Sequence, residues 1–411
     1  MKTINSYIVS ALLLTLVQNS GQAADKRRSL KPSQGQANRT VLRLTPGITK
    51  DPNRYVDRSG AVMNFLGGSD KTEQAVRLGL DWLAKQQKED GRWEETAGPI
   101  AHTGLAMLCY YGYGASHTPE SPYEETLAKA VEWMIKKVGP EGQLMGGGRM
   151  YDQAIGTLAL AEAYGVSKDE RIKRPLENAI KFLVRSQNPK TGGWRYVPHY
   201  LKEDDGDLSV SGWAIMALAS AQISGIGVSQ GSKAKALEFL DRVGTGAKRG
   251  MYGYKTPSPR PAMTAEGMYS YELLVGTKEN VRLDESVKYL MTHLPDKTQE
   301  NFYYWYYGTL ALRLYGGEGW EAWNSRMSPL LLDLQSSEGY WSPMGKRGKK
   351  EGRIVTTTWA ILSLEVYYRY TPLGQVTRRV IRGVTVDTGG GPGQTSSFSR
   401  ASTRPNSGRP Q

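Results

Sequence analysis

Between Asp70 and Leu373 apolar residues recur at the spacing of an α-helix, and this spacing predicts helices of two kinds. Helices of the first kind carry one apolar stripe with charged residues on the opposite side. This is the pattern of a helix that lies on the outside of a protein and turns one face toward its core. The six stripes are Leu80, Leu83 and Ala84; Val131, Met134, Ile135 and Val138; Ile180, Leu183 and Val184; Ala236, Phe239, Leu240 and Val243; Val287, Leu290, Met291 and Leu294; and Met327, Leu330, Leu331 and Leu334.

Each striped segment is followed by a Gly-rich turn and by a segment that is rich in Ala, Gly, Ser, Thr and aromatic residues and nearly lacks Lys and Arg. A helix without a charged face is buried on most sides, so these segments are predicted inner helices. They are Pro99–Tyr111, Tyr151–Tyr164, Leu208–Ile223, Ala262–Leu274, Phe302–Tyr315 and Ile354–Tyr370. Six outer and six inner helices that alternate along the chain predict an all-α fold, an (α/α)6 toroid. Its inner ring is expected to surround a central cavity that opens at one end.

A short motif recurs at the end of three outer helices: Gln, then Gly, then Trp. Its copies run from Gln87 to Trp93, from Gln187 to Trp194 and from Gln335 to Trp341. Such a recurrence is typical of stacked copies of one supersecondary unit. Gly ends the helix in a conformation that other residues resist. We expect the Trp to cover the turn and the Gln amide to bridge to backbone groups of the next repeat, so the motif is predicted to stabilise the fold.

Gln-x3-Gly-x-Trp repeats on a double ring of helices resemble the squalene cyclase and protein prenyltransferase β-subunit superfamily, over residues 70–373. The segments Asn301–Thr309 and Thr356–Ala360 are similar to those of exported, single-toroid bacterial proteins that carry this repeat. The resemblance implies the toroid fold. It implies no particular chemistry, because one fold supports many functions.

In the cyclases of this superfamily an Asp-x-Asp-Asp-Thr-Ala motif holds a protonated carboxylic acid that starts cyclisation. The segment Asp204–Trp213, at the start of the third predicted inner helix, matches part of this motif, with Leu208 in place of the last Asp. The resemblance implies Asp207 as the catalytic acid and Asp205 as its partner, because an Asp stays neutral only in an apolar cavity or beside a second carboxylate.

The prenyltransferases have Asp-x-Cys in the same place and complete a zinc site with a later His. Here Ser209 replaces the Cys, and residues 356–358 are all Thr where the His is needed. Zinc prefers thiolate, imidazole and carboxylate ligands, so we expect neither a metal nor another cofactor. A structural role for Asp207 is also open: an Asp at the start of a helix caps free N–H groups, and Asp204 and Asp205 are then solvated loop charges.

Other candidate ligand-binding residues lie on the predicted inner helices. A continuous aromatic run at residues 303–307 must place some rings toward the centre of the toroid. Aromatic faces stabilise carbocations, stack on sugar rings or hold apolar chains, although packing between the two rings of helices accounts for most of them without a ligand. The candidates are His102, Tyr151, Asp152, Trp213, Glu266, Tyr303, Trp305 and Trp359.

The first residues have the pattern of a secretory signal peptide: Lys2, an apolar run at Tyr7–Val17 and small residues up to Ala23 and Ala24, after either of which cleavage is expected. We therefore expect residues 1–24 to be removed and the protein to be exported to the periplasm or cell envelope. No Cys lies near the cleavage site, so lipid attachment there is not expected.

Most of the net charge of +13 belongs to two flanks. Residues 25–58 carry nine basic and three acidic side chains, and residues 375–411 carry six Arg and one Asp. The expected organisation is a basic N-terminal segment at 25–66, the toroid at 67–373 and a disordered basic tail at 374–411. The flanks are candidates for contact with an acidic envelope polymer or a membrane surface. Export argues against nucleic acid as a partner.

We expect a binding or scaffolding module of the cell envelope, whose cavity mouth takes an apolar, isoprenoid-like or otherwise extended ligand. One alternative is a class II terpene or polyprenyl cyclase that starts by protonation from Asp207. A polysaccharide-degrading enzyme is a third possibility, because such enzymes also use (α/α)6 rings. It needs paired carboxylates across the cavity, for which Asp152, Asp207 and Glu266 are the nearby residues.

Overall fold

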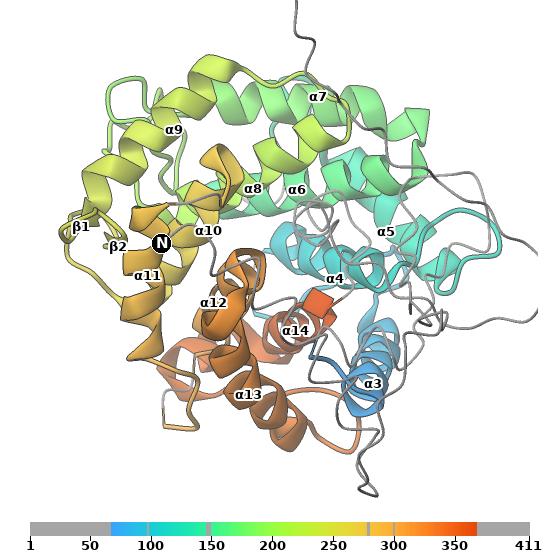
Figure 1. Cartoon of the computed structure of the whole chain (residues 1–411). Helices are drawn as coiled ribbons and strands as arrows, with labels where there is room; N and C mark the ends of the chain where they lie inside the picture. Colours follow the sequence, from blue (N-terminus) through green and yellow to red (C-terminus); the bar gives the residue numbers. More distant parts are fainter. Residues whose placement is uncertain (1–66, 97, 145–148, 278–279, 299–300, 368–411) are drawn as a thin grey trace, which may run out of the picture.

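Twelve α-helices alternate between an outer and an inner ring in the part of the chain that the computed structural model describes, residues 67–96, 98–144, 149–277, 280–298 and 301–367 (Figure 1). The outer ring consists of α3 (Asp70–Gln86), α5 (Glu124–Lys137), α7 (Glu170–Arg185), α9 (Gln230–Val243), α11 (Val281–Met291) and α13 (Gly317–Leu334). The inner ring consists of α4 (Pro99–Tyr113), α6 (Met150–Ser167), α8 (Leu208–Ile223), α10 (Pro261–Val275), α12 (Phe302–Tyr315) and α14 (Gly345–Leu364). Two short antiparallel strands, β1 (Gly244–Thr245) and β2 (Met251–Tyr252), and the 3-10 turn η1 (Glu365–Tyr367) complete these elements.

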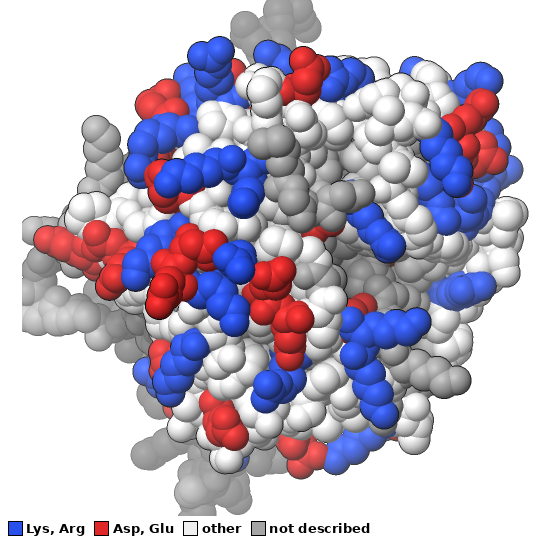
Figure 2. Space-filling model, turned by 180° about the vertical axis from the view of Figure 1, so that it is seen from behind, with Lys and Arg blue, Asp and Glu red and all other residues white. Residues whose placement is uncertain are grey.

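Each inner helix packs against the next one along the chain, and α14 packs against α4, so the inner ring is closed. In the outer ring α3 contacts α13, which brings the first and last outer helices together. The predicted all-α (α/α)6 toroid is confirmed. Figure 2 shows acidic and basic side chains intermixed over much of one face, and none of the helices in the described ranges is long and apolar enough to cross a membrane. The predicted signal peptide, the basic segment at 25–66 and the tail at 374–411 lie outside the described residues.

Each of the three copies of the Gln-Gly-Trp motif joins its own repeat to the next by hydrogen bonds, as the sequence predicts. In each copy the Gln side-chain amide donates to the carbonyl of the Gly in its own turn and to a carbonyl on a neighbouring outer helix. The second acceptors are Thr126 on α5 for Gln87, Ser232 on α9 for Gln187 and Ala75 on α3 for Gln335, at 2.8, 3.0 and 2.8 Å. The indole N–H of each motif Trp donates at 2.7 Å to the preceding helix, through Trp93 to Leu83, Trp194 to Leu183 and Trp341 to Leu331.

Aromatic side chains pack against one another in the middle of the inner ring, where the sequence predicts a cavity. Trp213 on α8 stacks on Tyr306 of α12, with ring centroids 6.1 Å apart and planes 9° apart. Trp359 of α14 lies 5.6 Å from Trp213 and 4.9 Å from Tyr306. Tyr303 and Tyr307 complete the cluster. These five rings are buried, so the space available to a ligand lies above them, at the end of the ring.

Candidate functional site

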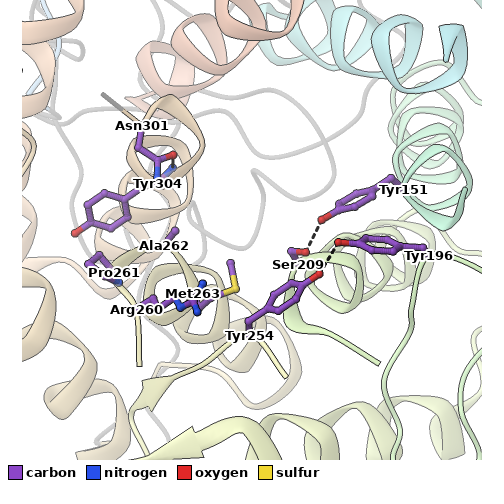
Figure 3. Close-up of a pocket in the computed structure, with 10 residues that line it drawn as sticks. All are labelled: Tyr151, Tyr196, Ser209, Tyr254, Arg260, Pro261, Ala262, Met263, Asn301 and Tyr304. Atoms are coloured by element: carbon purple, nitrogen blue, oxygen red, sulfur yellow. Dashed lines mark hydrogen bonds between the residues drawn. The ribbon is translucent and has the colours of Figure 1, made fainter. Parts of the chain in front are cut away.

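A pocket of about 640 Å³ opens at the N-terminal ends of the inner helices (Figure 3). This volume lies within the roughly 300–1,000 Å³ of small-molecule sites. Its walls come from the first turns of α6, α8, α10 and α12 and from the loops that precede α8 and α10. The lining residues are Tyr151, Tyr196, Ser209, Tyr254, Arg260, Pro261, Ala262, Met263, Asn301 and Tyr304. The pocket thus lies at the mouth of the toroid, next to the aromatic cluster: Tyr304 lines it, and the neighbouring Tyr303 belongs to the cluster.

One wall of the pocket is a hydrogen-bonded cluster of hydroxyl groups. Tyr151 bonds to Ser209, and Tyr196 bonds to Tyr254 with 2.5 Å between the two phenol oxygens (Figure 3). The Arg195 guanidinium lies behind the second pair: it donates to the Tyr254 hydroxyl at 2.7 Å and covers the Tyr196 ring at 3.8 Å from its centroid. Burial raises the pKa of Tyr151 and of Tyr254, so both phenols remain protonated near neutral pH.

Asp207 supports the cluster of hydroxyl groups from the side that faces away from the pocket. Its carboxylate accepts from the Ser209 hydroxyl at 2.7 Å, from the Val210 backbone N–H at 3.0 Å and from Arg195 Nη1 at 2.5 Å. The Val210 contact makes Asp207 the N-cap of α8. The side chain is fully buried and is not among the residues that line the pocket. Asp207 therefore fixes the position of Ser209 and Arg195 and does not itself reach the pocket.

The expected partnership of Asp205 with Asp207 requires correction. Asp205 is exposed, and the partner that the structure gives Asp207 is Arg195. Asp204 joins the same group of charges instead: its carboxylate lies 3.4 Å from Arg195 Nε and 3.0 Å from the Lys255 amine. The physical reason is that the chain turns between Asp204 and the N-cap, which directs the Asp205 side chain to solvent. The negative charge of Asp207 is therefore balanced by the Arg195 guanidinium and not by a second carboxyl group.

Three other polar candidates are buried away from the pocket lining. Asp152 accepts the Ala101 backbone N–H at 3.1 Å, and burial raises the pKa of its carboxyl group. His102 bonds through Nδ1 to the Gly98 carbonyl at 3.1 Å, whereas its buried Nε2 has no hydrogen-bond partner among the described residues. Glu266 accepts the Tyr303 hydroxyl at 2.7 Å. In the part of the chain that the structure describes, no group of three or more His, Cys, Asp and Glu side chains is placed to hold a metal ion.

No protein-family model and no curated protein matches the chain. Several solved structures do match the chain. The type II terpene cyclase MstE from Scytonema is 16% identical with a TM-score of 0.50, over 72% of this chain and 98% of that one. An inactive variant of the α-1,6-mannanase GH76A of Salegentibacter sp. HEL1_6, in complex with α-1,6-mannotriose, is 11% identical with a TM-score of 0.54, over 72% and 98%. A protein from Actinoplanes is 14% identical with a TM-score of 0.50, over 71% and 98%.

The chain has the terpenoid cyclase-like α/α toroid fold. At such low identity the likeness concerns the fold alone, because toroids of this kind include both a cyclase and a mannanase. The sequence resemblance stated above and the structural similarity therefore agree on architecture and leave the chemistry to the site.

Of the ligand-binding candidates named from the sequence, Tyr151 lines the pocket of the toroid. Trp213, Tyr303 and Trp359 form the aromatic cluster beneath it, and Trp305 is buried against Phe302, 4.9 Å away between ring centroids. Sequence reasoning anticipated Tyr304 only as part of the aromatic run at 303–307 and missed the other lining residues, above all Tyr196, Tyr254, Arg260 and Asn301. Arg260, Asn301 and Tyr304 lie just before or within the first turn of an inner helix, a signal that is visible in the sequence once all inner helices are known to start at the same end. Tyr196 and Tyr254 lie farther upstream, in the loops that precede α8 and α10, and carry no such signal.

Proposed function

We propose that the toroid is a binding module of the cell envelope and not an enzyme, and that the pocket at its mouth is the binding site. The observation that carries this proposal is the chemistry of the lining: among the described residues it consists of Tyr, Ser, Asn, Arg and apolar side chains, without Asp, Glu, His, Cys or Lys. General acid–base catalysis near neutral pH relies on such titrating side chains. The pocket offers hydrogen bonds and aromatic rings, which bind and orient a ligand, and burial raises the pKa of Tyr151, Tyr254 and Tyr304, which makes these phenols poor proton donors near neutral pH.

The cyclase alternative needs a neutral Asp207 that reaches its substrate. Asp207 instead sits behind Ser209 and accepts from the Arg195 guanidinium at 2.5 Å. The aromatic rings that would hold a carbocation are stacked on one another, as Trp213 is on Tyr306. Both features weigh against initiation by Asp207.

The polysaccharide-degrading alternative needs two carboxyl groups that face each other across the substrate. Asp152, Asp207 and Glu266 are each engaged by a neighbour, namely the Ala101 N–H, Arg195 and the Tyr303 hydroxyl. None of the three lines the pocket. Their engagement favours a structural role for these carboxyl groups and binding as the function of the pocket.

Export of the protein is part of the proposal. It is supported by the apolar run at Tyr7–Val17 and the small residues that follow it. In the envelope the basic flanks at residues 25–58 and 375–411 would contact an acidic polymer or membrane surface and hold the toroid there. Fractionation of cells that express the full gene tests this part. Recovery of the uncleaved protein in the cytoplasm would contradict it.

A combined binding and turnover experiment tests the function. The processed protein is incubated with oligosaccharides and with a linear polyprene, binding is measured by calorimetry, and the recovered compounds are examined by mass spectrometry and chromatography. We expect at least one compound to bind and all to be recovered unchanged. Tyr196→Ala should weaken binding, whereas Tyr200→Ala, at a residue that is 49% exposed and outside the pocket lining, should not. A shortened oligosaccharide or a cyclised isomer, lost in Asp207→Asn, would replace the binding proposal with catalysis.

A further inference from the structure

The hydroxyl wall has a spare hydrogen-bond donor. Ser209 donates to Asp207, so the Tyr151 hydroxyl must be the donor in its bond with Ser209. Tyr254 accepts from Arg195 and shares a single hydrogen bond with Tyr196. The two phenols have two O–H groups, and only one of them donates in the Tyr196–Tyr254 bond, so the other O–H has no acceptor among the described residues, whichever oxygen donates. The wall can therefore donate a hydrogen bond to an acceptor group of a ligand.

The opposite wall contributes positive charge. Arg260 lines the pocket, is exposed and forms no salt bridge within the described residues. It precedes α10, whose first turn is uncapped by any side chain and begins with Pro261. Ala262 and Met263 of this turn also line the pocket, where the N–H groups of a helix start and the positive end of its dipole favour an acceptor. Since none of the described residues that line the pocket is a carboxylate, none of them balances the Arg260 guanidinium.

The lining of the pocket favours a sugar ring over a long apolar chain. The buried aromatic cluster of Trp213 and Tyr306 occupies the middle of the inner ring, so the ligand is bound by the polar and aromatic residues at the mouth. Tyr151, Tyr196 and Tyr254 are each partly exposed and combine a ring surface with a hydroxyl group. Such side chains contact the C–H face of a ligand and hydrogen-bond to its oxygens at the same time.

We infer that the pocket binds an acidic sugar, a uronic acid residue of an oligosaccharide, with its carboxylate directed to Arg260 and the first turn of α10. This inference rests on the proposed binding function and gives it a ligand class. The sugar ring lies against the tyrosines of the hydroxyl wall, and neighbouring residues of the oligosaccharide extend out of the open mouth. Arg260 determines specificity for the acid, because a guanidinium pairs with a carboxylate through two charge-assisted hydrogen bonds.

The test compares trisaccharides of galacturonic, mannuronic and guluronic acid with their methyl esters, which keep the rings and hydroxyls and lose the charge. Calorimetry is performed on the processed full chain as wild type, Arg260→Gln, Arg260→Lys and Arg242→Gln. Arg242 is an exposed residue of the outer helix α9 and serves as the matched control. The basic flanks are present in every variant, so their contribution to the binding of the acids is the same in each, and the effect of Arg260 is read from the difference between variants. Sodium acetate as a competitor separates recognition of the sugar from binding of a bare carboxylate.

We expect at least one acidic trisaccharide to bind about tenfold or more tightly than its ester, and Arg260→Gln to remove this preference. Arg260→Lys should retain part of it, and Arg242→Gln should retain it in full. Equal affinity for acid and ester would overturn the inference and leave a binding module for neutral ligands. Equal losses in Arg260→Gln and Arg242→Gln, displacement by acetate alone, or no binding of any acid would also overturn it. Shortened trisaccharides would instead contradict the proposed binding function.

Discussion

Asp207 takes part in an ion pair with Arg195 and in the N-cap of α8. The Asp207 carboxylate is buried in both contacts, and both contacts help to determine where α8 begins beside the pocket. A residue that the sequence singles out by its resemblance to a catalytic acid is thus accounted for by the packing of charge around a helix end. The distinction is measurable, because a structural role affects folding whether or not a ligand is present.

Asp207→Ala is expected to lower the free energy of unfolding by about 2–4 kcal/mol, because it leaves α8 uncapped and removes the closer of the two carboxylates that pair with Arg195. The loss stays moderate since the Arg195 side chain remains 20% exposed. Urea denaturation measures the change. Asp205→Ala is the control, and its exposed side chain should leave the unfolding midpoint where it is. Similar midpoints for the two variants would mean that Asp207 does not stabilise the fold.

Glu272 on α10 gives a pH-dependent prediction. Its carboxyl group is buried, neither oxygen has a hydrogen-bond partner among the described residues, and burial raises its pKa well above the ordinary 4.5. The folded protein therefore binds a proton that the unfolded chain releases above about pH 4.5, and stability falls as the pH rises from there toward the folded pKa. Glu272→Gln removes the proton release and should flatten this fall.

The measurement is chemical denaturation between pH 4 and pH 8. The stability advantage of Glu272→Gln over wild type should grow by about 1.4 kcal/mol for each pH unit between the two pKa values. Glu238→Gln, at an exposed position on the outer helix α9, controls for the general loss of a charge. A difference between wild type and Glu272→Gln that is independent of pH would show that Glu272 ionises normally in the folded protein.

The candidate site was only partly predictable from single residues. Carboxyl groups near helix starts suit acid–base chemistry, so the sequence makes candidates of Asp207, Asp152 and Glu266. In the structure each of them is held by a hydrogen-bond partner. Tyr254 and Arg260 carry no such local signal. They become site residues because the loop before α10 brings them beside α8, and that neighbourhood exists only in the folded ring.

At the scale of the element, the Gln-Gly-Trp turn shows how a local motif depends on its neighbour. Gly192 has a positive φ of +79°, and a Cβ built there would lie 1.8 Å from the backbone carbonyl oxygen of Lys235 on α9. The turn after α7 thus presses its backbone onto the next outer helix. Gln187 adds hydrogen bonds to the same helix through Ser232. The motif joins repeats because its glycine permits this close approach.

Gly192→Ala is expected to destabilise the protein by about 2–4 kcal/mol, from backbone strain and from the displacement of α9 together. Gly225→Ala separates the two effects: its φ is +92°, but no atom lies within 4 Å of the added Cβ. This control should cost only about 1–2 kcal/mol. Thermal and urea unfolding of both variants measure the difference. Equal losses would mean that the contact with α9 yields without cost.

At the scale of the whole molecule, contacts between distant parts of the chain close the toroid. Gln335, at the end of α13, donates to the Ala75 carbonyl on α3 at 2.8 Å. The Ile354 N–H donates to Glu95 at 2.9 Å, and the Thr96 hydroxyl donates to the Glu351 carbonyl at 2.9 Å. These contacts join the first repeat to the last. An open stack of the same helices would lose the packing of α3 on α13 and α14 and of α14 on α4.

Gln335→Ala is expected to loosen this closure without unfolding the ring. Amide hydrogen exchange should accelerate in α3 and α13 and change little in α7, because the lost hydrogen bonds act between the first and last outer helices. Gln187→Ala is the matched variant, since it removes the equivalent bonds between α7 and α9. Its effect should centre on those two helices. Uniform acceleration over all helices in both variants would contradict a local closing role.

The sequence by itself determined the architecture. Amphipathic stripes define the outer helices, and segments without charge define the inner ones, because burial and helical period are encoded by neighbouring residues such as Val131, Met134 and Ile135. The repeated Gln-Gly-Trp turns set how one repeat meets the next. Only the tertiary structure decided where open space remains: large aromatic side chains such as Trp213 and Tyr306 meet across the ring and fill its middle. It also decided that Asp207 faces Arg195 across the fold of the loop between α7 and α8, and that the pocket is lined by tyrosines and Arg260, which come from different repeats.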